Sequence, residues 1–257
     1  MTLGWRFFIH SIRQLLLNIG PALRISLLPY LIFLAVYLSI GQPAMVSITL
    51  MQDDPTLLEE NFGPVFRSIL TLGLVAAICF IWVAVAWHRY VLLEEEPGPF
   101  FARMQRGPMM AYLGASVRLF LVVFLFAIVI SVVVSILGGI LFVFPMLGIL
   151  IFTIGSVVLS AFILGLSMIL PAAALQDPIP LAQARQTAWA NLGPILVLSL
   201  LITLLNSIPQ ILTGTPLGPV VNSVSYQLPS QWLITMLSIS VATTLYGYFI
   251  QGRELVV

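Results

Sequence analysis

PIPLAQARQTAWANLGPIL, residues Pro178 to Leu196, is the stretch that decides the fold, because its second half has a counterpart near the start of the chain. Residues 13–23 read RQLLLNIGPAL. Both copies have Arg-Gln, then Asn-x-Gly-Pro-x-Leu, then a long apolar run. Proline suits the first turn of a helix, where its missing N–H is not needed. The two copies therefore predict one device used twice, a helix lying on the membrane surface that leads into a membrane-spanning helix.

The composition is that of an integral membrane protein. Hydrophobic residues make up 60% of the 257-residue chain and charged residues only 7%, with a mean hydropathy of +1.12. Soluble domains have roughly 45–50% apolar and about 25% charged residues. The chain has room for about six spans of roughly 20 residues. We therefore expect an all-α polytopic protein with residues 1–257 in a single membrane domain. A net charge of +1 without a basic stripe argues against a nucleic-acid partner.

The N-terminal surface helix is predicted over residues 3–18, where apolar and polar side chains separate at helical spacing. The predicted apolar face comprises Trp5, Phe8, Ile12, Leu15, Leu16 and Ile19, and the polar face Arg6, His10, Arg13 and Gln14. This pattern is typical of an interfacial amphipathic helix. A shorter middle copy, PGPFFARMQRGP at residues 97–108, predicts a similar entry.

Six long apolar runs follow from these entries as three hairpins. The predicted spans are Leu23–Ile40, Arg67–Tyr90, Leu119–Leu137, Leu147–Leu170, Pro194–Leu212 and Trp232–Ile250. Spans three and four are separated only by Gly138, Gly139 and a few residues around Pro145, which predicts an antiparallel pair. Residues 41–64 are polar and acidic and are predicted outside the lipid. The repeats cover residues 3–91, 97–170 and 178–250, each with a cytoplasmic interfacial helix and two spans.

The arginines set the predicted orientation. All ten cationic residues are arginine, and with a cytoplasmic N-terminus only Arg67 falls on the far side. The cytoplasmic set comprises Arg6, Arg13, Arg24, Arg89, Arg103, Arg106, Arg118, Arg185 and Arg253. This bias follows the positive-inside rule and places both termini in the cytoplasm. We expect the first eight of these to contact lipid headgroups weakly, each exposed cation near the surface contributing about 1 kcal/mol.

Chemistry-bearing residues are sparse. No Asp, Glu, Arg or Lys falls in the middle of a predicted span, which argues against an ion-coupled transporter. His10 and His88 both lie at the predicted cytoplasmic boundary, where they could ligate a haem or a metal. A metal site generally needs three or four convergent ligands, so no metal, cofactor or catalytic residue is expected. Span five contains a polar interruption, Asn206 to Gln210, which is either the end of a span or a cavity wall.

The Ala-Arg helix, the aromatic residue and the Gly-Pro entry at Pro178 to Leu196 resemble a group of bacterial membrane proteins. The group includes the membrane domain attached to some glycerophosphodiester phosphodiesterases. The resemblance implies a helical repeat domain in a bacterial inner membrane, without the phosphodiesterase activity. We expect a non-enzymatic accessory or assembly component of a larger complex, whose partners are membrane lipids and other integral membrane proteins. The alternatives are a transporter or lipid-handling protein, and a membrane haem protein or enzyme.

Overall fold

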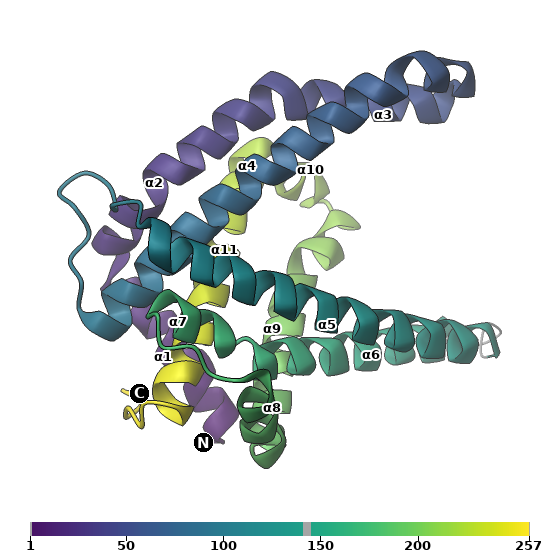
Figure 1. Ribbon diagram of the computed structural model, residues 1–257. Helices are drawn as coiled ribbons and strands as arrows, with labels where there is room; N and C mark the ends of the chain where they lie inside the picture. Colours follow the sequence, from purple (N-terminus) through teal and green to yellow (C-terminus); the bar gives the residue numbers. More distant parts are fainter. Residues whose placement is uncertain (1, 141–144, 257) are drawn as a thin grey trace.

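The computed structural model describes residues 2–140 and 145–256, and the regular structure of these residues is entirely helical (Figure 1). In this part of the chain six helical segments are long and apolar enough to cross a membrane. They are Ile19–Asp53, Glu59–Leu93, Arg106–Gly138, Met146–Ala174, Leu192–Thr213 and Ser225–Phe249. The prediction of an all-α chain with six helices able to span a membrane is confirmed. The predicted link between spans three and four includes residues 141–144, which lie outside the described residues.

The elements follow one another along the chain with few long connections. They are α1 (Leu3–Leu17), α2 (Ile19–Val36), a π-helix (Tyr37–Gly41), α3 (Gln42–Asp53), a 3-10 turn (Pro55–Leu57), α4 (Leu58–Leu93), α5 (Arg106–Ile140), α6 (Pro145–Leu166), α7 (Ile169–Ala174), α8 (Leu181–Ala190), α9 (Leu192–Thr213), α10 (Gly218–Val221) and α11 (Val224–Phe249).

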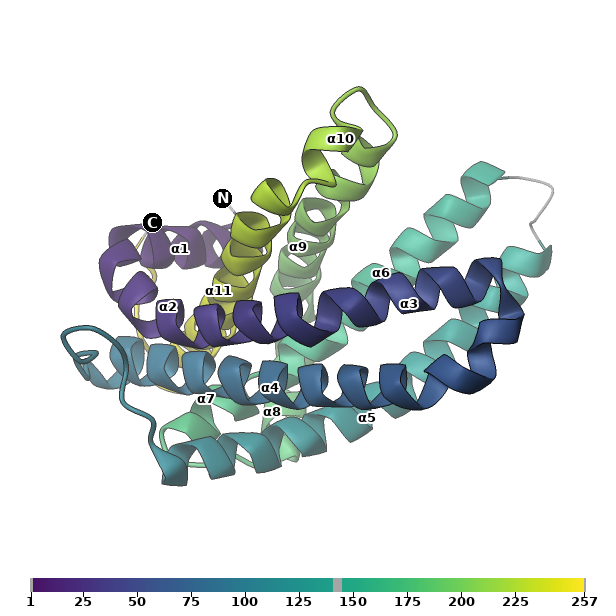
Figure 2. The same ribbon diagram turned by 90° about the horizontal axis from the view of Figure 1, so that it is seen from above.

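The helices form three arms that leave a common base (Figures 1 and 2). In the first arm α2 and α3 pack along α4, and in the second α5 packs along α6. In the third, α9 and α11 are joined through the short α10. Both termini, α1, α7 and α8 lie at the base (Figure 1). The packed core therefore sits at the base, and the arms present long apolar surfaces.

The first arm is longer than the sequence predicts. Residues 42–53 continue the helix as α3, so the whole segment Ile19–Asp53 spans 35 residues. At 1.5 Å per residue this is about 50 Å, well over the roughly 30 Å of a bilayer core. A π-helix at Tyr37–Gly41 joins the two parts. A Cβ on Gly41 would lie 2.9 Å from Leu72 Cδ2, so glycine permits the contact with α4.

α11 is the most buried of the spans: 61% of the residues in its most apolar 18-residue stretch are buried within the chain. Its polar side chains join it to three other helices. Thr244 Oγ1 accepts from Ser11 of α1 at 3.0 Å, and Thr243 Oγ1 pairs with His88 Nδ1 of α4 at 2.8 Å. Trp232 Nε1 donates to Ser26 of α2 at 2.7 Å. These contacts place α11 at the centre of the base, hydrogen-bonded to α1, α2 and α4.

α1 is part of this core, and the face it buries within the chain shares only Leu15 with the predicted apolar face. It packs against both α9 and α11. Its buried residues are Gly4, Phe7, Ser11 and Leu15, and of the predicted apolar face Leu16 is 57% exposed and Ile19 41% exposed. The small residues let neighbouring helices approach: a Cβ on Gly4 would lie 2.4 Å from the carbonyl oxygen of Pro194. Close helix packing, more than side-chain hydrophobicity, chooses the buried face.

The two Asn-x-Gly-Pro motifs form the same junction. Asn18, between α1 and α2, has φ −116° and ψ 31°, and Asn191, between α8 and α9, has φ −123° and ψ 32°. Each amide side chain donates to a carbonyl four residues earlier, Gln14 at 2.8 Å and Thr187 at 2.9 Å. The repeated sequence thus produces a repeated turn between two helices.

The middle copy keeps only half of this junction, and the prediction of a surface helix there was wrong. Residues 94–105 form an irregular loop, and α5 begins at Arg106. Gln105 takes the place of the asparagine, and its carbonyl accepts from Met109 N at 3.1 Å, as a helix start requires. Its side chain reaches away to Glu95 instead of capping a preceding helix. The longer amide and the prolines before it explain the missing helix.

Candidate functional site

Seven of the eight arginines predicted to meet lipid headgroups have exposed side chains. They are Arg6, Arg13, Arg24, Arg103, Arg106, Arg118 and Arg185. Arg67 and Arg118 lie inside helices that are longer than the predicted spans: Arg67 belongs to α4, and Arg118 belongs to α5, where its Nε donates to the Gly114 carbonyl at 3.3 Å. These two arginines are helical because α4 and α5 extend beyond the predicted spans.

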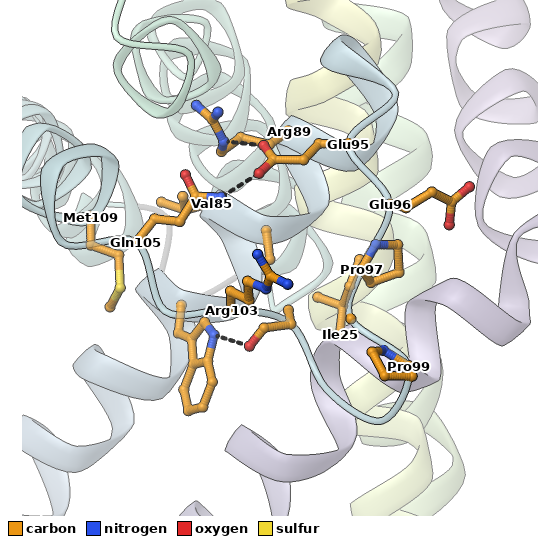
Figure 3. Close-up of a pocket in the computed structure, with 14 residues that line it drawn as sticks. Ile25, Val85, Arg89, Glu95, Glu96, Pro97, Pro99, Arg103, Gln105 and Met109 are labelled. Atoms are coloured by element: carbon orange, nitrogen blue, oxygen red, sulfur yellow. Dashed lines mark hydrogen bonds and ion pairs between the residues drawn. The ribbon is translucent and has the colours of Figure 1, made fainter.

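Arg89 is the exception, because its guanidinium is engaged within the protein. Its Nε lies 2.6 Å from Glu95 Oε2, and its Nη1 donates to the Ala174 carbonyl of α7 at 3.1 Å. Glu95 Oε1 accepts from Gln105 at 2.5 Å. This chain of contacts ties the loop of residues 94–105 to α4 and α7, and Figure 3 shows its links from Glu95 to Arg89 and Gln105. Arg89 therefore stabilises the packing of this loop against the base.

The braced loop covers a cavity of about 380 Å³, called here the loop cavity (Figure 3). Trp82 Nε1 donates to the Ala102 carbonyl at 3.2 Å and holds the loop across it. The charged groups of the lining are Arg89, Arg103, Glu95 and Glu96. The charges of these two cations and two anions sum to zero, so the lining has no net charge that would select an ionic ligand.

A second cavity, of about 310 Å³, lies between the second arm and the repeated stretch that opens the sequence. It is called here the α8 cavity, and its walls include Phe126 of α5, Val158 and Phe162 of α6, Arg185 and Trp189 of α8, and Leu196 of α9. The rings of Phe126 and Phe162 stack with centroids 4.0 Å apart. Arg185 is the charged residue of this lining. The cavity thus combines apolar walls with a single cation.

Glycine and alanine set the width of the α8 cavity. A Cβ on Gly165 of α6 would lie 2.6 Å from Ala188 Cβ, so this pair brings α8 directly onto α6. Trp189 is nevertheless 65% exposed, and Arg185 is exposed one turn earlier. Both side chains line the cavity and reach the surface, so they lie at its opening. The cavity itself has no signal in the sequence.

The two histidines have separate partners. His88 is fully buried, pairs through Nδ1 with Thr243 and stacks on Tyr112 with ring centres 5.8 Å apart. His10 Nδ1 accepts from Val256 N at 3.0 Å, near the C-terminus. Over residues 2–140 and 145–256 there is no group of three or more His, Cys, Asp or Glu side chains placed to hold a metal ion.

The polar interruption of span five remains helical. α9 continues through Pro209 to Thr213, and Ser207 Oγ donates to the Thr203 carbonyl of the same helix at 2.8 Å. Asn206 and Gln210 line neither the loop cavity nor the α8 cavity. The loop cavity is therefore charge-balanced, and the α8 cavity is apolar with one cation. Comparison with protein families, curated proteins and solved structures finds no match for this chain.

Proposed function

We propose that this protein is a non-catalytic accessory or assembly component of a larger complex in the bacterial inner membrane. The observation that supports this is the second arm. In the most apolar windows of the spans Arg106–Gly138 and Met146–Ala174 only 6% and 11% of residues are buried within the chain, against 61% in the span of α11. An arm that contributes so little to its own core is available to other membrane helices.

The surface of the second arm suits helix association. Lipid supplies no hydrophobic drive for helix pairing, so contacts rely on small residues and close packing. A Cβ on Gly155 would lie 2.7 Å from Val134, so this glycine holds α6 against α5. Gly148, two turns earlier on α6, has no atom within 4 Å of its Cβ position. Gly148 therefore leaves a notch that a partner helix can enter.

The proposed arrangement has three hairpins with both termini in the cytoplasm. Both chain ends lie at the base (Figure 1), as an even number of spans requires. The far tip of the first arm carries Asp53, Asp54, Glu59 and Glu60. Hydrogen bonds from the Thr56 hydroxyl and amide lower the pKa of Asp54, so its carboxylate is charged near neutral pH. Charges are costly in the bilayer core, which favours placing this tip in water outside the cell membrane.

A photo-crosslinking amino acid on the second arm tests the proposal. We expect a crosslinker in place of Phe152 of α6, which is 68% exposed, to capture discrete membrane proteins when irradiated in native membranes. The same crosslinker in place of Met236, which is 1% exposed in α11, should give only products within the chain. If position 152 yields lipid adducts alone, the arm has no protein partner and the proposal is wrong.

A lipid-handling protein is the second candidate, and one observation favours it: the apolar α8 cavity with Arg185 at its opening. The resemblance of Pro178 to Leu196 to bacterial phosphodiesterase membrane domains stays part of the proposal and bears on fold rather than on activity. Capture of proteins at position 152 with an empty α8 cavity supports the complex component. Lipid adducts alone at position 152, together with a lipid bound in the α8 cavity, support lipid handling.

A further inference from the structure

We infer that the α8 cavity is a binding site for an anionic phospholipid, with one acyl chain between the second arm and α8 and the headgroup paired with Arg185. The inference does not depend on the proposed protein partners, because the cavity is formed within this chain alone.

The walls of the cavity match an acyl chain. Its volume of about 310 Å³ falls at the lower end of the range for ligand pockets, about 300–1,000 Å³. Phe126, Val158, Phe162 and Leu196 supply aromatic and aliphatic surface from three helices. Burying apolar surface is favourable in proportion to its area, at about 25 cal/mol per Å². A flexible hydrocarbon chain is therefore the type of ligand that these walls select.

The opening matches an anionic headgroup. Arg185 is exposed, and among the described residues no carboxylate lies within ion-pair distance of it; the ion pair that the structure contains joins Arg89 to Glu95. Guanidinium groups pair well with phosphate because their donors form a planar fork. Trp189 is exposed one turn after Arg185, and tryptophan is enriched at the level of lipid headgroups. The two side chains thus define a headgroup end and a chain end.

The repeated junction explains why this site exists at only one of the two copies. Both junctions connect two helices through Asn-x-Gly-Pro, but α1 packs tightly against α9 and α11. Its residues Phe7 and Leu15 are 0% and 1% exposed. α8 buries only Ala184, so the space beside it is left for a ligand.

Photoactivatable lipids test the site in the full-length protein reconstituted into phosphatidylcholine vesicles. Phosphatidylglycerol and phosphatidylcholine, each carrying the same diazirine-bearing acyl chain, are added separately in trace amounts, and crosslinked peptides are mapped by mass spectrometry. We expect phosphatidylglycerol to label the wall from Val158 to Leu166 about fivefold more than phosphatidylcholine, the ratio that one cation near an anionic headgroup supplies. Leu125, which is 64% exposed on α5, is the reference position and should show no headgroup preference.

Three variants separate the site from general attraction to anionic lipid. Arg185→Gln should reduce phosphatidylglycerol labelling of this wall to the phosphatidylcholine level, whereas Arg185→Lys should retain part of the preference. Arg24→Gln removes an exposed arginine that does not line the cavity and should leave the labelling unchanged. Val158→Phe fills the cavity and should lower labelling of Phe162 by both lipids. The inference is overturned if both lipids label the wall equally, if Arg185→Gln has no effect, or if Arg24→Gln has the same effect.

Discussion

The junctions at Asn18 and Asn191 have nearly the same backbone and the same side-chain hydrogen bond, yet the helices before them have different fates. α1 is enclosed by α9 and α11, with four buried residues along one face. α8 lies at the surface, and of its residues Ala184 is buried. A short motif therefore fixes the local turn, and long-range packing decides whether the helix becomes core or borders a cavity.

The largest difference between the two helices is expected when an aromatic side chain is removed from each. Phe7→Ala should destabilise the protein by about 3–5 kcal/mol, because Phe7 is fully buried and packs edge-on against Tyr248 and Phe249. Trp189→Ala at the exposed surface of α8 should change stability by about 0.5 kcal/mol or less. The free energy of unfolding in mixed micelles measures both. Equal costs would contradict the assignment of α1 to the core.

The next largest effect is expected from adding one methyl group beside α1. Gly4→Ala forces the Pro194 carbonyl to move and should cost about 1–3 kcal/mol. Gly20→Ala, just after the Asn18 junction, meets no atom within 4 Å and should be neutral or slightly stabilising. The two variants are compared in the same unfolding assay. A neutral Gly4→Ala would show that α1 does not approach α9 this closely.

A smaller effect distinguishes the two asparagines. Asn18 Oδ1 also accepts from Tyr90 at 2.7 Å, a contact that Asn191 Oδ1 lacks among the described residues. We expect Asn18→Ala to cost about 1 kcal/mol more than Asn191→Ala, the usual net worth of one hydrogen bond. Repeating the comparison with Tyr90→Phe should abolish the difference. A difference that survives in this background has another origin.

The smallest effect concerns the middle copy, which an ion pair braces in place of a helix. Glu95→Gln removes the charge opposite Arg89, and because Glu95 is 40% exposed the expected cost is only about 0–1 kcal/mol. High salt should have a similar effect on the wild type by screening the pair. Protease cleavage within residues 94–105 measures both changes, and cleavage at a salt-independent rate would count against the brace.

Sequence patterns predicted the helical class, six apolar spans and the shared junction, because apolar length and Asn-x-Gly-Pro chemistry act locally. They did not predict that residues 42–53 continue the helix along α4. They also did not predict that α1 buries Gly4 and Ser11 within the chain. Both features depend on a neighbouring helix, distant in sequence, that supplies the packing contact.

The candidate site was predictable only in part. Arg185 was among the arginines expected near headgroups. The walls of the α8 cavity come from Phe126, Val158 and Phe162, which lie 23 or more residues before Arg185 in the sequence. Such side chains look like ordinary span residues until the second arm is placed beside α8. No local sequence pattern predicts that the second arm lies beside α8.

Hydrogen exchange of α1 and α8 tests most directly whether α1 belongs to the core and α8 to the surface. Amide protection follows the free energy of local opening, which is highest in core elements. In the full-length protein, peptides from Leu3–Leu17 should exchange about as slowly as those from the buried part of α11, and peptides from Leu181–Ala190 should exchange markedly faster. Equal and rapid exchange of both segments would show that α1, like α8, lies outside the core, and would contradict the account.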